Sequence, residues 1–150
     1  MPIHQGIHKD RSVARRKAVQ IIYQSQITGQ PLPDAMVNGL FVDEVGVPCE
    51  YTQRLIAGIA EHLDEIDSLI DSISENWSIE RMPLVDRGIL RLAVYEIKYE
   101  NSVPVGVSIN EAIELARDFG GADDSSKFIN GVLGKVALSS ETSKKISQEQ

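Results

Sequence analysis

The stretch PLVDRGILRLAVYEIKY, residues 83–99, decides the fold class because its apolar residues cover more than half of a helical circumference. These apolar residues are Val85, Ile89, Leu90, Leu92, Ala93, Val94 and Ile97. Pro83 suits the first turn of a helix, where its missing N–H group is not needed for a hydrogen bond. Glu96 falls within the apolar arc, and a buried carboxylate needs a hydrogen-bonding partner, so we expect it to have a structural role. The stretch therefore predicts a central helix.

Helical periodicity continues on both sides of this stretch. Apolar residues recur at spacings of three and four, and no segment sustains the alternation expected of a half-buried strand. Further helices are expected over about 12–28, 34–45, 49–75 and 125–138, with one more between Ser108 and Gly120. Ser108 and Glu111 form an S-x-x-E capping box, which predicts that the helix between Ser108 and Gly120 starts at Ser108. The fold class is therefore all-α.

The helix pattern also predicts the domain organisation. We expect one all-helical domain over residues 1–138, with two lobes at about 10–75 and 80–138. Six helices, three on either side of a central break, fit two packed three-helix bundles. Residues 139–150 are polar and cannot offset the entropy cost of ordering, so we expect them to form a flexible tail.

Composition limits the function classes. With 150 residues, 42% of them apolar, the chain can bury one substantial core. The first ten residues lack the apolar run of a secretory signal, and no apolar segment approaches the roughly 20 residues that span a bilayer. The single Cys49 cannot form an intramolecular disulfide. We therefore expect a cytoplasmic protein that does not enter a membrane.

Residue patterns for catalysis and cofactor binding are absent from the sequence. His4, His8 and His62 have no partners at ligand spacing, and there is neither a C-x-x-C motif nor a glycine-rich phosphate loop. We therefore predict a protein that is not an enzyme and that uses no metal ion or cofactor.

Charge is strongly segregated along this chain, whose formal net charge is −7. Residues 1–20 contain five Lys and Arg residues and one acid, a balance of +4. Residues 21–80 contain one basic residue, Arg54, and eleven acids, a balance of −10. The acidic field is largely screened beyond a Debye length of about 8 Å at physiological salt. A local basic patch can therefore still bind phosphates, with an affinity that depends on salt.

The basic end of the first helix has the residue types of an RNA-binding surface. On a helical wheel Arg16 points away from the apolar stripe, Arg11 and Arg15 lie on its shoulders, and Tyr23 shares the outward side. Guanidinium groups contact phosphate in a bidentate manner while bases stack on aromatic rings. A helix end that serves only solubility is the alternative.

The last predicted helix has a second polar cluster. Lys127, Asn130, Gly131 and Gly134 lie away from its apolar stripe. Each interior glycine costs about 1 kcal/mol relative to alanine, so we expect another helix or a ligand strand to approach the backbone there. For a nucleic-acid ligand, Lys127 and Asn130 would supply phosphate and base-edge contacts.

Four segments together resemble the NusB family of bacterial transcription antitermination factors. They are ARRKAVQIIYQ, DRGILRLAVYEI, VSINEAIELARDFG and DDSSKFINGVLGKVA, in the family's order and spacing, and the resemblance covers about residues 11–138. It implies two three-helix bundles and a heterodimer with the small-subunit ribosomal protein NusE that binds boxA in nascent RNA. It also implies a role with RNA polymerase and other Nus factors in the elongation complex, notably on ribosomal RNA operons.

The resemblance assigns roles by position. Arg11, Arg15 and Arg16 fall in the arginine-rich RNA-binding segment, which is shortened here because Ser12 and Val13 stand where some members have arginine. Lys127 and Phe128 match the RNA-facing edge, Asp124 matches an acidic position near that surface, and Asp86 matches a residue used against the ribosomal protein. The candidate RNA-binding residues are thus Arg11, Arg15, Arg16, Tyr23, Asp124, Lys127, Phe128 and Asn130, and the candidate partner-binding residue is Asp86.

Other function classes stay open at this point. The large acidic surface also fits a protein-only helical adaptor, or a homodimer that buries its basic helix in its own interface. A related accessory domain occurs on ribosomal RNA cytosine methyltransferases, but no catalytic domain follows residue 138 in this sequence.

Overall fold

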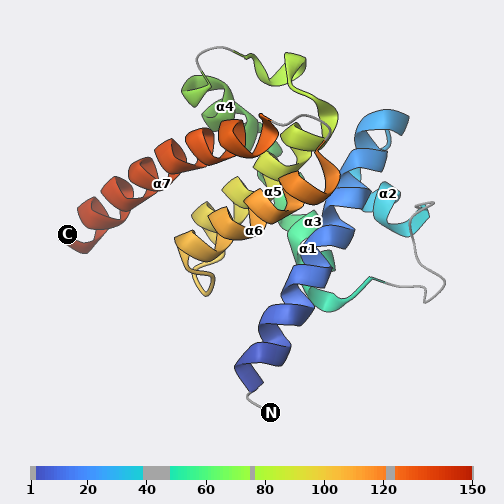
Figure 1. Cartoon of the computed structure of the whole chain (residues 1–150), viewed down its shortest axis with the longest axis horizontal. Coiled ribbons are helices and arrows are strands. Elements are labelled where there is room, and N and C mark those ends of the chain that lie inside the picture. Colours follow the sequence, from blue (N-terminus) through green and yellow to red (C-terminus); the bar gives the residue numbers. More distant parts are fainter. Residues whose placement is uncertain (1–2, 39–47, 75–76, 121–123, 150) are drawn as a thin grey trace. The chain divides into compact units, whose positions relative to one another are not determined.

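The computed structural model describes residues 3–38, 48–74, 77–120 and 124–149, and the side chains of 10–37, 48–74, 77–120 and 124–139. Its elements are α1 (Ile3–Thr28), α2 (Leu32–Asn38), α3 (Glu50–Glu61), α4 (Leu63–Ile73), the 3₁₀ helix η1 (Ile79–Arg81), α5 (Leu84–Tyr99), α6 (Val105–Phe119) and α7 (Ser125–Glu149), coloured in chain order in Figure 1. Every element in these ranges is helical, which confirms the all-α prediction. None of these described helices is long and apolar enough to cross a membrane.

The chain divides into two compact units, and the first is Met1–His62. Within its described residues, α1, α2 and α3 each contact the other two, which makes a three-helix bundle. Its buried apolar side chains include Ala14, Ala18, Ile21, Ile22, Ala35, Leu55, Ile56 and Ile59. The buried Thr52 hydroxyl donates a hydrogen bond of 3.0 Å to the Ala14 carbonyl and so ties α3 to α1. α1 ends before Gly29, whose φ of +78° lies in the left-handed region that glycine adopts without strain.

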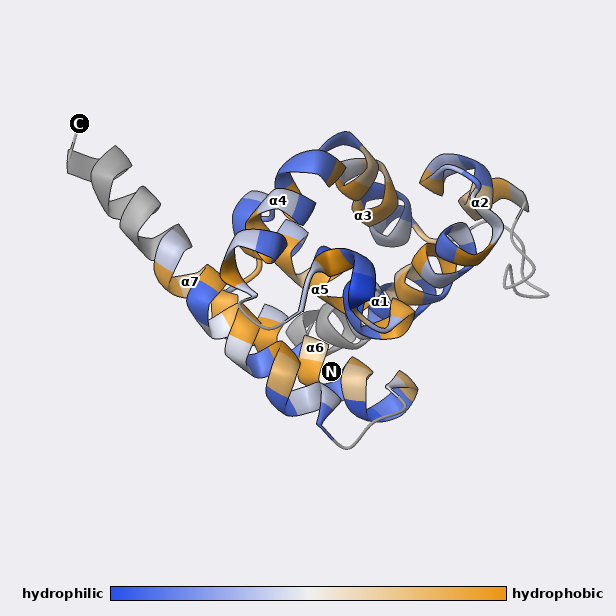
Figure 2. Ribbon diagram, turned by 90° about the horizontal axis from the view of Figure 1, so that it is seen from above, coloured by the Kyte–Doolittle hydropathy of each residue, from blue (hydrophilic) through white to orange (hydrophobic). Residues whose placement is uncertain are grey.

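The second unit is Leu63–Gln150, and α5 lies at its centre. α5 contacts α4, α6 and α7, and its buried residues are Asp86, Gly88, Ile89, Leu90, Leu92, Ala93, Val94, Tyr95, Glu96 and Ile97. This burial confirms the central helix predicted from residues 83–99, including the position of Glu96 inside the apolar arc. Figure 2 shows hydrophobic residues recurring along α5 and along the described part of α7.

The division between the units differs from the expected one. The sequence predicted a single helix over 49–75 and lobes that meet between 75 and 80. In the structure this helix is interrupted at His62, where φ is −110° and ψ is 19°. α4 packs against α5 and α7 and buries Ile66 and Ile70 in the second unit. The second unit therefore includes α4 in addition to α5, α6 and α7, because the apolar residues of α4 are buried there.

The predicted capping box at Ser108 is wrong. α6 begins at Val105, one turn earlier, and the Ser108 N–H group already donates a backbone hydrogen bond to the Pro104 carbonyl at 3.2 Å. The Ser108 side chain is buried inside the helix, so its hydroxyl does not cap the helix. The backbone turn that follows Pro104 therefore starts the helix without a side-chain cap.

Three other helix ends also differ from expectation. α1 starts at Ile3 rather than near residue 12, and α2 covers Leu32–Asn38, whereas the rest of the expected helix 34–45 lies outside the described residues. α7 continues to Glu149, so the segment 139–150, expected to be a flexible tail, has a helical backbone through Glu149. No glycine or proline occurs between residues 135 and 149, and adding a residue to an existing helix costs much less than starting one.

Candidate nucleic-acid interface

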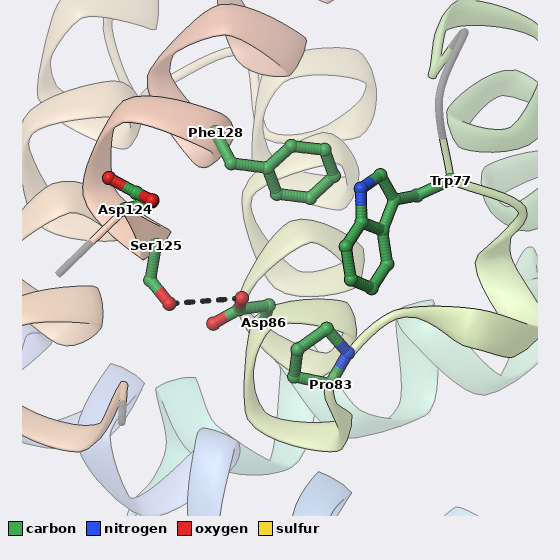
Figure 3. Close-up of a pocket in the computed structure, with 6 residues that line it drawn as sticks. All are labelled: Trp77, Pro83, Asp86, Asp124, Ser125 and Phe128. Atoms are coloured by element: carbon green, nitrogen blue, oxygen red, sulfur yellow. Dashed lines mark hydrogen bonds between the residues drawn. The ribbon is translucent and has the colours of Figure 1, made fainter. Parts of the chain in front are cut away.

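A pocket in the second unit brings together three of the predicted site residues. Its cavity measures about 280 Å³ and is lined by Trp77, Pro83, Asp86, Asp124, Ser125 and Phe128 (Figure 3). Asp86 lies in the first turn of α5, and Phe128 lies in the first turn of α7, 42 positions later in the chain. Packing of α5 against α7 therefore places the candidate partner-binding residue beside two candidate RNA-binding residues.

Asp86 is held in place by Ser125. Only 4% of Asp86 is exposed, and the Ser125 hydroxyl donates a hydrogen bond of 3.0 Å to its Oδ2 atom. Burial raises the pKa of the Asp86 carboxyl above its ordinary value, and the hydrogen bond from Ser125 opposes this increase in part. Sequence reasoning missed Ser125, although serine is common where a helix begins.

Two aromatic side chains form the apolar part of the pocket. Figure 3 shows the rings of Trp77 and Phe128 pointing toward one another, with Pro83 and Asp86 nearby. Trp77 is 47% exposed and Phe128 is partly buried. The segment before η1 is fixed by two hydrogen bonds, from the Ser74 hydroxyl to the Trp77 carbonyl and from the Ile79 N–H group to Asp71. Sequence reasoning missed Trp77 because it belongs to no periodic pattern.

The chemistry of this pocket favours a cation with an apolar stem. Asp86 and Asp124 supply carboxylates, while Trp77 and Phe128 supply aromatic surface. Lysine and arginine side chains match both features, since their methylene groups pack on apolar surface and their charged ends pair with carboxylates. A phosphate group would meet two carboxylates here and would be repelled.

The outer side of α7 has a different character. Lys127, Asn130 and Gly131 are exposed, and Gly134 is partly exposed. A Cβ atom added at Gly131 or Gly134 would meet nothing within 4 Å, so no other helix in the described part of the chain packs against these glycines. Of the two occupants predicted for this surface, a helix is therefore not found among the described residues, which leaves the surface open to a ligand strand.

The predicted basic residues of α1 differ in accessibility. Arg16 is exposed, and Arg11 and Tyr23 are partly exposed. Arg15, predicted at the shoulder of the apolar stripe, is only 1% exposed, so the prediction of an accessible guanidinium is wrong for this residue. Its Cζ atom lies 5.7 Å from the centroid of the Tyr51 ring on α3, because α1 and α3 pack together in the first unit.

Tyr51 is the centre of a basic cluster that sequence reasoning missed. The Cζ atoms of Arg11 and Arg54 lie 4.6 and 5.3 Å from its ring centroid, in addition to Arg15. A cavity of about 370 Å³ adjoins this cluster and is lined by Asp10, Arg11, Cys49, Glu50, Tyr51 and Arg54. The available signal was the solitary basic charge of Arg54 between residues 21 and 80.

Metal binding finds no support in the ranges that the structure describes. No three His, Cys, Asp or Glu side chains in those ranges come together as a group that could hold a metal ion.

Comparison with known proteins gives consistent matches. The sequence profile of the NusB family matches residues 12–138. Transcription antitermination protein NusB of Bacillus cereus (strain B4264) is 43% identical over 126 residues, which cover 84% of this chain and 95% of that protein. The protein of the same name from Desulforamulus reducens is 41% identical over 129 residues, which cover 84% of this chain and 88% of that protein.

Solved structures are similar over most of the chain. T. maritima NusB matches with a TM-score of 0.77 and 37% identity, covering 85% of this chain and 90% of that one. A crystal structure of antitermination factors NusB and NusE in complex with dsRNA matches with a TM-score of 0.76 and 27% identity, covering 87% of this chain and 98% of the matched chain.

Proposed function

Because the chain belongs to the NusB family, we propose that it binds boxA-type RNA as a heterodimer with ribosomal protein NusE and so supports the transcription of ribosomal RNA. The observation that carries this proposal is the similarity to a structure of NusB and NusE with dsRNA over 87% of this chain. The relatives are named as antitermination proteins and not as enzymes, and the function proposed here is likewise non-catalytic. It acts with RNA polymerase and other Nus factors, in the cytoplasm where bacterial transcription takes place.

We assign RNA binding to the open side of α7 and to the accessible basic residues of α1. Lys127 and Asn130 are exposed beside two glycines that leave the backbone uncovered, which suits phosphate and base-edge contacts. Arg16, Arg11 and Tyr23 supply guanidinium groups and an aromatic ring in the first unit. Arg15 stabilises the packing of α1 on α3 under this surface, because its buried guanidinium lies beside Tyr51.

We assign the protein partner to the pocket at Asp86. A lysine or arginine of NusE would pair with the fixed Asp86 carboxylate and pack its stem between Trp77 and Phe128. Phe128 follows Lys127 directly in the first turns of α7, and Asp124 is the residue that precedes α7. In this proposal they form the boundary between the partner-binding pocket and the RNA-binding side of α7.

The test is a titration of boxA RNA with this chain, with and without NusE, at several salt concentrations. We expect NusE to increase RNA affinity and log K to fall linearly with log salt, because the bound phosphates release counterions. A scrambled RNA of equal length is the control. Equal affinity for both RNAs in the presence of NusE would contradict boxA recognition, and no binding of either RNA would contradict the whole proposal.

A homodimer is a second candidate that one observation favours. Val13 and Ile27 are 59% and 57% exposed on α1, and their separation of 14 residues brings them to nearly the same face of the helix. Contact with a second copy through α1 would remove both side chains from water, which is favourable for apolar surface. Sedimentation equilibrium would distinguish the candidates, because a homodimer through α1 would dissociate when RNA occupies that helix, whereas a monomer would show no concentration dependence.

A further inference from the structure

The basic cluster at Tyr51 joins charges from two distant parts of the sequence. Arg11 belongs to α1 and Arg54 to α3, and both line the same cavity of about 370 Å³. Their guanidinium carbons lie 4.6 and 5.3 Å from the Tyr51 ring centroid. Such distances are typical of cation–π contacts, in which the ring attracts each guanidinium group. The cavity therefore has two guanidinium groups positioned by one aromatic ring.

The second guanidinium group of the cavity, that of Arg54, comes from an acidic part of the sequence. Arg54 is the only basic residue among residues 21–80, which contain eleven acids, yet the fold places it beside the basic end of α1. In the sequence the arginine-rich segment is interrupted by Ser12 and Val13. In three dimensions Arg54 therefore adds to α1 a positive charge that the linear arginine run lacks.

The lining also contains groups that accept hydrogen bonds. Asp10 and Glu50 contribute carboxylates to the cavity, and the buried Arg15 has its Cζ atom 5.7 Å from the Tyr51 ring centroid. Two carboxylates disfavour a bare phosphate ion because of charge repulsion. They favour a ligand that has hydroxyl or amino donors in addition to a phosphate, and carboxylates accept such bonds from the amino groups of bases.

We propose that this cavity binds one nucleotide of the single-stranded RNA, with its phosphate on Arg11 and Arg54 and its sugar or base donors on Asp10 and Glu50. This inference rests on the proposed RNA-binding function and adds a nucleotide subsite in the first unit to it. The cavity volume falls in the range of small-ligand pockets, about 300–1,000 Å³. A guanidinium group can bind phosphate through two parallel N–H···O hydrogen bonds. The 2′-hydroxyl of RNA is a further donor for the carboxylates.

Cys49 provides a direct measurement of occupancy. It lines this cavity, is exposed, and is the only cysteine in the chain. We would follow alkylation of Cys49 by iodoacetamide with mass spectrometry, using the full chain with NusE and boxA RNA. RNA at ten times its dissociation constant should slow alkylation about tenfold, since the free fraction of the protein falls by about that factor.

Arg54→Gln is the variant that isolates the subsite. Arg54 is exposed on α3, so we expect the fold to survive. The variant should weaken RNA binding several-fold, reduce the salt slope by about 0.7 and abolish the protection of Cys49. Arg117→Gln is the matched control, because Arg117 is exposed on α6 and its loss changes the net charge equally. It should leave the salt slope and the protection unchanged.

The outcomes separate this inference from the function on which it rests. In the first outcome the wild-type chain binds RNA, but RNA protects Cys49 equally in Arg54→Gln and in the wild type. This outcome would overturn the subsite and leave the proposed function intact. No RNA binding in the presence of NusE would overturn both. Polyphosphate that protects Cys49 as well as RNA does, at equal phosphate concentration, would overturn the assignment to a nucleotide and indicate a general anion site.

Discussion

Ser125, the first residue of α7, donates a hydrogen bond of 3.0 Å to Asp86 in the first turn of α5. This bond fixes a carboxylate that is almost fully buried yet lines a pocket open to a partner. Asp86 therefore affects both stability and recognition, and the two effects can be measured separately.

The stability effect of Asp86 depends on pH. Its pKa is raised by burial, so the folded protein holds this proton more tightly than the unfolded chain, whose carboxyl has the ordinary pKa of 3.8. The resulting stabilisation is fully present below pH 3.8 and is lost as pH rises through the raised pKa. Asp86→Asn should remove this loss of unfolding free energy, as measured by urea unfolding across a pH series. If the unfolding free energy of Asp86→Asn fell with rising pH as much as that of the wild type, the assignment to Asp86 would be contradicted.

The recognition effect of Asp86 concerns the protein partner. Asp86→Asn should weaken NusE binding at least about tenfold, because one member of a buried charge pair is lost while its shape is kept. Charge reversal is less suitable here, since a buried lysine would also disturb the fold. Calorimetry gives the affinity, and Asp64→Asn, at an exposed position on α4, is the control. Equal affinities for wild type and Asp86→Asn would remove Asp86 from the interface.

Trp77 reports on the same pocket. It is the only tryptophan in the chain and is 47% exposed. When NusE fills the pocket, the indole should lose contact with water, and its fluorescence should shift to shorter wavelength. Asp86→Asn should require a higher NusE concentration for the same shift. Emission from Trp77 that is insensitive to saturating NusE would place the partner elsewhere.

Arg15 and Arg16 should behave as opposites although they are adjacent. Arg16→Ala removes an exposed guanidinium, so it should weaken RNA binding and change the unfolding free energy by no more than about 0.5 kcal/mol. Arg15→Ala removes a large, fully buried side chain beside Tyr51 and should lower the unfolding free energy by roughly 2 kcal/mol or more. Thermal unfolding and RNA titration of both variants would test this. Equal stability losses would contradict the difference in burial.

Gly131 should show a conflict between stability and RNA binding. A Cβ atom there meets nothing within 4 Å, so Gly131→Ala should stabilise the free protein by up to about 1 kcal/mol through helix propensity. The same methyl group should weaken RNA binding if the strand approaches the α7 backbone. Gly106→Ala on α6, where a Cβ is equally unobstructed, is the control. It should stabilise the protein without changing RNA affinity. A stabilised Gly131→Ala with unchanged RNA affinity would show that the RNA does not approach this glycine.

The sequence by itself determined the helical class and the central helix, because both depend on local periodicity. The apolar spacing along residues 83–99 required burial on several sides, and α5 is buried in that way, with Glu96 inside its apolar arc. Helical angle alone also predicted that Arg16 is exposed and that Lys127 and Asn130 face away from the apolar stripe of α7.

Tertiary structure decided where the chain divides and which distant residues meet. The break at His62 and the burial of Arg15 depend on which helix packs against which, and periodicity within one helix does not contain that information. The same reason applies to both cavities. Ser125 reaches Asp86 only because α7 packs on α5, and Arg54 reaches the α1 basic cluster only because α3 packs on α1.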